Sequence, residues 1–345
     1  MLLSDKVSIC FDDVLGIPQY SDISSRDEIN LEVKAKGLHA KVPIVSAPMD
    51  TIAGVDFLAV MAQRGGLGII HRYQTIDSAR YEFEAVKAIL NDETSLSRIG
   101  VAIASSGDFL ERAQALYDVG CRFFCVDVAH GHHVSTRYAL EVLRNTFGTS
   151  VHLMAGNVAT LEAFNDLADW GADSIRVGIG GGSICTTRIQ TGHGMPTLQS
   201  VIDCARSDRD ALLIADGGIR STGDALKALG MGADLVMMGS MLAGTDETPG
   251  EAIVVNGEMV KTYRGMASRD AQMNWRGYVR SEEGVTATAP CKGPLGELIS
   301  DIDIKLKTGL SYAGARSINE YHAKAKFQRQ TSTSRDEAVA HQLRG

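Results

Sequence analysis

Short apolar runs rich in valine and isoleucine recur along almost the whole chain, and each run is continuous rather than alternating. A strand that is buried on both faces of a parallel sheet has this pattern, whereas a half-exposed strand alternates apolar and polar residues. The pattern therefore predicts eight buried strands, at Val42–Val45, Leu67–Ile70, Ile99–Ile103, Phe123–Val126, Val151–Met154, Ser174–Val177, Leu212–Ala215 and Leu235–Met238.

Helix-length segments separate these runs, among them Gly107–Val119, Thr160–Trp170 and Thr222–Gly230. Thr160 and Thr222 stand where a hydroxyl typically caps the start of a helix, and glycines follow the expected helix ends. Eight strands that alternate with helices predict an α/β fold, either a closed (β/α)8 TIM barrel or a doubly wound open sheet.

The barrel is favoured because polar and glycine-rich phrases follow almost every predicted strand. In a barrel these loops converge on one face, where they can build a site. An open sheet that binds a dinucleotide would carry a glycine-rich fingerprint after its first strand, and none follows Val42–Val45.

The segments beyond the eighth strand are less regular. Glu251–Lys261 is typical of a hairpin around an Asn-Gly turn, and Leu295–Thr308 is predicted to be a helix. Between them, residues 267–288 are polar and lack a clear period, which predicts a mobile flap. We therefore expect one catalytic barrel domain over residues 1–325, followed by a loosely held polar tail at residues 326–345.

Composition narrows the class of protein. The 345 residues include 34 basic and 42 acidic side chains, for a net charge of −8, which argues against a nucleic-acid-binding surface. No apolar run approaches the roughly 20 residues of a membrane span, and the charged N-terminus does not resemble a secretory signal. The six cysteines are widely spaced without a CxxC pair, which predicts reduced thiols in a cytoplasmic protein.

The most informative segment is the loop after the sixth strand. Four glycines at positions 178, 180, 181 and 182 lead into Cys185, which is flanked by hydroxyl residues. Glycines allow a tight backbone, and a cysteine on such a loop is placed to act as a nucleophile. Arg188 would favour its thiolate form. A flexible loop with an incidental buried thiol is the alternative.

Two further glycine phrases predict a phosphate cradle. Asp216-Gly217-Gly218 and Gly239-Ser240 end the seventh and eighth strands, where barrels commonly bind phosphate through backbone N–H groups. Glycines that merely form tight turns are the alternative for either phrase alone. Asp216 could accept hydrogen bonds from ribose hydroxyls.

The cluster of His130, His132 and His133 suggests a metal site, but zinc usually needs ligands gathered from separate segments, and no second cluster follows. A metal at these histidines is therefore the minor hypothesis. Asp127, at the end of the fourth strand, is the stronger candidate for contact with a substrate or cofactor.

Several of these segments together resemble the IMP dehydrogenase/GMP reductase family. They are Gly180–Arg188 with Thr191-Gly192, Asp216-Gly217-Gly218, Met238-Gly239-Ser240 and Tyr263-Arg264-Gly265-Met266. The resemblance runs from Phe11 to about Ala315, which is nearly the whole chain. It implies a TIM barrel that assembles as a homotetramer.

The resemblance also implies roles for individual residues. Cys185 would attack C2 of a purine nucleotide monophosphate, and Thr187 and Glu283 would relay a proton. The nucleotide would contact Ser183, Asp216, Gly217, Gly218, Gly239, Ser240, Gly265, Met266, Ala267, Arg280 and Gly284. The dinucleotide would contact Ser25, Arg26, Arg72, Asp127, Val128 and Ala129. A monovalent cation, K⁺, would lie at Gly180, Gly182, Cys185 and Arg188.

The two branches of the family differ outside the barrel. IMP dehydrogenases usually insert a pair of CBS modules, but the connection from His71 to Ile99 is only long enough for a helix. Their flap also carries an Arg-Tyr pair that activates water, which Arg276-Gly277-Tyr278 does not match. Arg280–Gly284 resembles the reductase pattern, whereas Gly66–His71 is more similar to the dehydrogenases.

The resemblance therefore favours a GMP reductase, which would use NADPH to convert GMP to IMP and ammonia through a covalent thioimidate on Cys185. The alternative is an IMP dehydrogenase without CBS modules, which would oxidise IMP to XMP with NAD. A third hypothesis is a catalytically silent nucleotide-binding sensor on the same scaffold.

Overall fold

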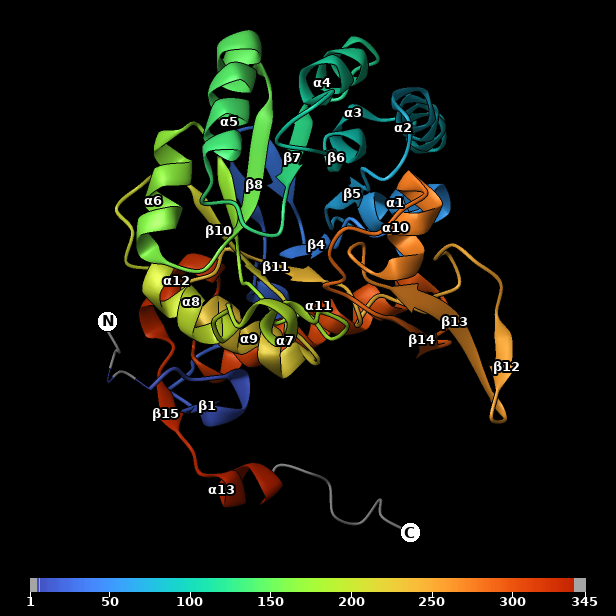
Figure 1. Ribbon diagram of the computed structural model, residues 1–345. Helices are drawn as coiled ribbons and strands as arrows, with labels where there is room; N and C mark the ends of the chain where they lie inside the picture. The colour runs from blue at the N-terminus through green and yellow to red at the C-terminus, as the bar shows by residue number, and fades with distance from the viewer. Residues whose placement is uncertain (1–4, 6, 338–345) are drawn as a thin grey trace.

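Eight parallel strands form the central sheet of the computed structural model, which describes residue 5 and residues 7–337 (Figure 1). In sheet order they are β4 (Ile44–Ser46), β11 (Leu235–Met238), β10 (Leu212–Asp216), β9 (Ser174–Val177), β8 (His152–Val158), β7 (Phe123–Asp127), β6 (Ile99–Ile103) and β5 (Gly68–Ile70). A parallel bridge between Val45 and Leu67 joins the two edge strands and closes the barrel. All eight strands coincide with the apolar runs, so the prediction of a (β/α)8 TIM barrel is confirmed.

Helices surround the barrel because each strand is buried on both faces and each helix buries one apolar stripe against it. They are α1 (Val55–Gln63), α2 (Ile76–Leu90), α3 (Glu93–Leu96), α4 (Phe109–Asp118), α5 (Val134–Phe147), α6 (Leu161–Asp169), α8 (Thr197–Cys204), α9 (Thr222–Gly230), α11 (Leu295–Tyr312) and α12 (Ile318–Lys324). Thr160 caps α6 as predicted. The cap of α9 is Ser221 rather than Thr222, because the Ser221 hydroxyl accepts the Asp224 N–H.

A small hairpin covers the N-terminal end of the barrel. It consists of β2 (Val33–Ala35) and β3 (Leu38–Ala40). His152, the first residue of β8, is buried and donates from Nδ1 to the Lys36 carbonyl at 3.1 Å. Arg98, just before β6, donates to the His39 carbonyl at 2.9 Å. The strands therefore expose only their C-terminal ends to a site.

The segment after the eighth strand is more ordered than the sequence predicts. The expected hairpin forms from β12 (Ile253–Val255) and β13 (Glu258–Arg264), and β14 (Thr286–Pro290) pairs with β13. Within the predicted flap lies the helix α10 (Arg269–Arg276). Its buried side chains are only Ala271 and Gln272, so the sequence carries no apolar period that would reveal it.

The two ends of the described chain pair with each other. β15 (Phe327–Arg329) lies antiparallel to β1 (Val14–Gly16), and α13 (Ser332–Glu337) follows it. Residues 327–329, which the sequence assigns to a loose tail, are therefore part of a sheet, and the tail's residues 338–345 lie outside the described residues. Among the described helices, none has the length and apolar character that crossing a membrane requires.

Burial of His152 predicts an acid-sensitive fold. Burial lowers the pKa of His152 below its usual 6.5, and its Nε2 accepts the Ser174 hydroxyl at 2.8 Å, which also requires the neutral ring. As the pH falls through about 6.5, the unfolded chain binds a proton that the folded chain does not, so stability falls by at most about 1.4 kcal/mol per pH unit. In His152→Gln, denaturant unfolding should show a smaller loss of stability on acidification.

The control is His130→Gln, because His130 is exposed. Its unfolding free energy should follow the parent's pH dependence. An unchanged slope in His152→Gln would contradict the role assigned to the buried ring.

Candidate active site

A cavity of about 350 Å³ opens at the C-terminal ends of the barrel strands. Residues that follow β4, β5, β7, β9, β10 and β11 line it, together with Asn157 of β8 and residues of the flap. The convergence that the sequence predicts is therefore present. Most predicted site residues line this cavity, namely Arg72, Asp127, Val128, Ala129, Gly180, Gly182, Ser183, Cys185, Thr187, Asp216, Gly217, Gly218, Gly239, Ser240, Gly265, Met266, Ala267, Glu283 and Gly284.

The loop that carries Cys185 needs its glycines. Gly178 has φ +143°, and a Cβ there would lie 1.9 Å from the Asp216 carbonyl oxygen. Gly180 has φ +77°, a conformation that side chains rarely adopt. The backbone thus turns tightly after β9 and places Cys185 in the cavity, immediately before the short helix α7 (Thr187–Thr191).

The three predicted catalytic residues form one hydrogen-bonded line. The Cys185 thiol lies 3.2 Å from Thr187 Oγ1, and the Thr187 hydroxyl donates to Glu283 Oε2 at 2.9 Å. Ser281, which the sequence analysis did not select, donates its hydroxyl to Glu283 Oε1 at 3.2 Å. A proton can pass along this line between the carboxylate and a group bound beside the sulfur.

The flap residue Glu283 reaches the cysteine loop through backbone pairing. Thr186 N–H donates to the Glu283 carbonyl at 2.9 Å, and Val285 N–H donates to the Ile184 carbonyl at 3.0 Å. The bridge between Cys185 and Gly284 lies between these two bonds. This part of the predicted mobile flap is therefore hydrogen-bonded directly to the loop that carries Cys185.

Hydroxyl and N–H groups gather at the ends of β10 and β11. Ser183, Gly218, Gly239 and Ser240 line this part of the cavity. Tyr263, which the sequence analysis quoted only within a motif, places its hydroxyl 3.3 Å from Ser183 Oγ. Burial raises the pKa of Tyr263, which keeps this hydroxyl neutral and able to donate. The arrangement suits a phosphate group.

A buried guanidinium joins the two carboxylates of the site. Arg176 of β9 pairs with Asp127 and, at 2.9 Å, with Asp216. Burial opposes the charge of Arg176, but the carboxylates of Asp216 and Asp127 raise its pKa well above the usual value. Burial would raise the pKa of Asp127, but Arg176 and Arg72 hold it below the usual value. Asn157 also donates to Asp216, at 2.7 Å.

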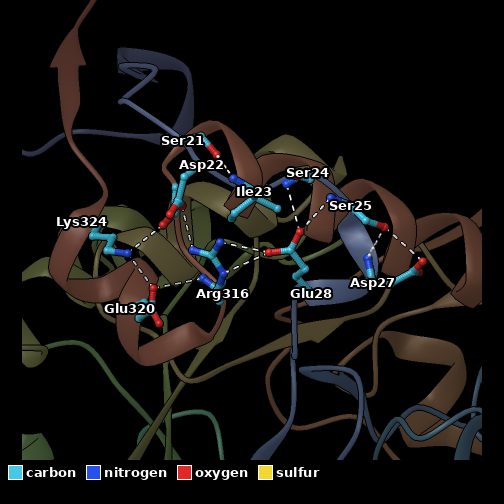
Figure 2. Close-up of polar contacts among 11 residues, drawn as sticks. Ser21, Asp22, Ile23, Ser24, Ser25, Asp27, Glu28, Arg316, Glu320 and Lys324 are labelled. Atoms are coloured by element: carbon cyan, nitrogen blue, oxygen red, sulfur yellow. Dashed lines mark hydrogen bonds and ion pairs between the residues drawn. The ribbon is translucent and has the colours of Figure 1, made fainter.

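Ser25 and Arg26 do not line the cavity. Ser25 caps the short 3₁₀ helix η2 (Arg26–Glu28), and its N–H donates to the Glu28 carboxylate (Figure 2). Arg316, just before α12, pairs with the same carboxylate and with Asp22, so this N-terminal segment is fastened to α12 (Figure 2). Within one chain these two residues therefore lie apart from the other predicted dinucleotide contacts.

Arg188 and Arg280 also lie outside the cavity lining. The Arg188 guanidinium donates to the Met195 carbonyl at 2.6 Å. The backbone carbonyl of Arg188 accepts the N–H of Gly192, the residue that caps the C-terminal end of α7. The Arg280 guanidinium lies over the ring of Tyr278. The Arg188 side chain nevertheless lies against Gly180 of the cysteine loop.

The histidine cluster makes other contacts. His132 pairs with Asp166 at 2.8 Å and stacks on Trp170. Within the part of the chain that the structure describes, no three His, Cys, Asp or Glu side chains gather as metal ligands. The cysteine loop instead offers neutral backbone carbonyls, a donor set that suits a monovalent cation such as K⁺.

Removing the buried guanidinium should destabilise the fold strongly. Arg176→Met would leave Asp127 and Asp216 without their shared cation, and breaking such a buried pair costs about 3–5 kcal/mol. The free energy of unfolding from denaturant titration measures this loss. Arg137→Met, which removes an exposed ion pair with Glu141, should cost much less, because water and salt screen that pair. Equal losses in the two variants would contradict the bridging role.

Comparison with known proteins agrees with this geometry. The model of the IMP dehydrogenase / GMP reductase domain matches residues 8–341. GMP reductase 1 of Rattus norvegicus is 35% identical over 93% of this chain and 94% of that protein. Inosine-5'-monophosphate dehydrogenase of Borreliella burgdorferi is 31% identical over 98% of both chains.

A solved structure is similar along the full fold. A cysteine-to-alanine variant of GMP reductase from Trypanosoma brucei, in complex with guanosine 5'-monophosphate, superposes with a TM-score of 0.90, at 28% identity and over 98% of both chains. The chain therefore belongs to the IMP dehydrogenase/GMP reductase family of oxidoreductases.

Proposed function

We propose that this enzyme is a GMP reductase that converts GMP, NADPH and protons to IMP, NADP⁺ and ammonium. The observation that carries the proposal is the line from Cys185 through Thr187 to Glu283 inside the family's cavity. The similar Trypanosoma brucei enzyme, which is named a GMP reductase, was solved with GMP bound.

The cavity offers a group for each part of the nucleotide. N–H groups of Gly218 and Gly239 and the hydroxyls of Ser183, Ser240 and Tyr263 would hold the phosphate. The Asp216 carboxylate would accept hydrogen bonds from the ribose. The backbone of residues 265–267 and Gly284 would meet the base, which then lies with C2 beside the Cys185 sulfur.

The chemistry follows from these positions. The Cys185 thiolate adds to C2 of GMP, and the C2–N2 bond then breaks. The departing amine takes the proton that the Cys185 thiol had passed through Thr187 to Glu283 and leaves as ammonia, so that a thioimidate remains on Cys185. Reduced nicotinamide, when bound, supplies a hydride to C2. The C–S bond then breaks, IMP leaves, and Cys185 recovers its thiolate.

The residues on the other side of the cavity fit a dinucleotide. Arg72, Asp127, Val128 and Ala129 line the same cavity as Cys185, so a nicotinamide held there could reach C2. Carbonyls of Gly180, Gly182 and Cys185 would hold K⁺ and thereby restrain the cysteine loop. The choice of NADPH over NADH rests on the reductase assignment alone.

IMP dehydrogenase is the second candidate, because the enzyme of that name from Chlorobaculum parvum is 37% identical over 84% of this chain. Two observations favour the reductase over it. Only α2 and α3 connect β5 to β6, so CBS modules are absent from that connection. Arg276 and Tyr278 do not line the cavity, so they offer no base for hydrolytic water. The intact catalytic line argues against a silent sensor.

We also propose that the enzyme is a cytoplasmic homotetramer. All six cysteines are free thiols, which suits a reducing compartment. The projecting β12 exposes three consecutive apolar side chains, from Ile253 to Val255, and an exposed apolar edge strand is normally covered by a partner (Figure 1).

The proposal predicts which substrates turn over together. Purified enzyme with GMP and NADPH should consume NADPH and release one ammonia per IMP formed. IMP with NAD⁺ should produce no XMP, because Arg276 and Tyr278, which would stand in for the dehydrogenases' water-activating pair, do not line the cavity. Absorbance at the nicotinamide band and an ammonia assay measure the two outcomes. XMP formation without ammonia release would establish the dehydrogenase instead.

Replacement of the relay residues should separate catalysis from binding. Glu283→Gln should slow turnover by about 10²–10⁴-fold with nearly unchanged GMP affinity, because proton transfer is lost while the backbone contacts remain. Cys185→Ala should abolish the covalent adduct, which mass spectrometry of trapped enzyme detects.

The neighbouring Glu282 provides a matched control. Its side chain is 42% exposed and pairs with Arg269, away from the relay. Glu282→Gln should therefore retain parental turnover. A Glu283→Gln enzyme that turns over as fast as Glu282→Gln would remove the relay assignment.

A further inference from the structure

The flap helix α10 buries one polar side chain, Gln272, which is only 2% exposed. The other buried residue of this helix is Ala271, so the helix packs through very little apolar surface. A buried amide without hydrogen-bond partners would destabilise the fold. The partners of Gln272 therefore show which part of the flap the helix binds.

The Gln272 amide uses both of its ends on the flap backbone. Its Nε2 donates to the Ala267 carbonyl at 3.0 Å and to the Ser281 carbonyl at 2.7 Å. Its Oε1 accepts the Arg280 N–H at 3.2 Å. Because the two N–H groups face carbonyls and the oxygen faces an N–H, only glutamine in this orientation satisfies all three contacts.

These contacts set the path of the segment that carries Glu283. The same Ala267 carbonyl also accepts the Glu283 N–H at 3.2 Å, so the amide and the catalytic residue share one acceptor. The Ser281 hydroxyl then donates to Glu283 Oε1, which leaves Oε2 facing Thr187. Gln272 is thus connected to Glu283 by two routes, one through the Ala267 carbonyl and the other through Ser281.

The remaining contacts of α10 with this segment are exposed. Arg269 pairs with Glu282 at 3.4 Å, and Thr286 donates to Asp270 at 2.6 Å. Exposed pairs of this kind contribute little, since water and salt screen them. Among the side-chain contacts between α10 and this segment, the buried amide is therefore the main one, and it acts from the side opposite the backbone pairing with residues 184–186.

We propose that Gln272 is a positioning residue that fixes Glu283 in the geometry required for proton transfer to Thr187. This inference rests on the proposed relay. Misplacing a catalytic group by about 1 Å costs on the order of 10²-fold in rate, so loss of the amide should appear in kcat. It should leave KM for the nucleotide nearly unchanged, because the proposed phosphate and ribose contacts other than Tyr263 lie on the barrel loops.

The test replaces Gln272 by Met, which fills the same space without hydrogen bonds. We expect kcat with GMP and NADPH to fall by about 10–100-fold and KM for GMP to change by less than about threefold. Gln272→Glu keeps the shape of the side chain but turns a carboxylate oxygen towards the two carbonyls. It should likewise lower kcat and leave KM for GMP nearly unchanged. Met273→Ala on the same helix is the control and should match the parent, since Met273 is 45% exposed.

A double-mutant cycle distinguishes positioning from general stability. If Gln272 acts through Glu283, adding Gln272→Met to Glu283→Gln should cost no further activity, whereas an independent structural loss would add to it. Additive effects, or kcat within twofold of the parent in both Gln272 variants, would overturn the proposal.

Hydrogen exchange tests the inference separately from the reaction. In Gln272→Met, amides of residues 280–285 should exchange faster, while those of the barrel strands keep the parental rates. Unchanged exchange in 280–285 would overturn the positioning role even if the enzyme proves to have another activity. Failure of the proposed function would instead appear as a parent enzyme that turns over neither substrate pair.

Discussion

The site depends on one charge arrangement, in which the Arg176 guanidinium is shared between Asp127 and Asp216. The two carboxylates offset the cost of burying this cation, and the cation in turn binds both of them. Through Arg72 and Asn157, the same arrangement reaches from the loop after β5 to the end of β10. The groups proposed for the ribose and for the dinucleotide are therefore held by one buried charge, before either ligand binds.

A second constraint is the separation along the sequence of the two residues of the proposed relay. Thr187 and Glu283 are 96 positions apart in the chain, yet their side chains are hydrogen-bonded. The backbone pairing of residues 184–186 with residues 283–285 brings these two side chains together, because backbone hydrogen bonds alone fix the register of the two segments. A fully mobile flap would pay the ordering entropy in each turnover. The part of the flap nearest the sulfur is thus built as an extension of the cysteine loop.

The sequence predicted those features that a local pattern determines. Eight short runs of mostly apolar residues revealed the barrel, and the glycines before Cys185 revealed the site loop. It missed α10, because a helix held by one buried glutamine has no apolar period, and it missed the pairing of β1 with β15, because contacts between chain ends leave no local signal. Arg176 was visible as a charge inside a buried strand, but its partners come from β7 and β10, which only the closed barrel brings together.

Identity along the chain does not separate the two branches of the family, since relatives of both names fall between 29% and 37%. The reactions differ in whether a proton reaches a departing amine or water is activated to attack the adduct. In this chain the flap supplies Glu283 to the cavity and keeps Arg276 and Tyr278 out of it. The proposed assignment to the reductase branch therefore rests on the short flap after the eighth strand rather than on overall sequence identity.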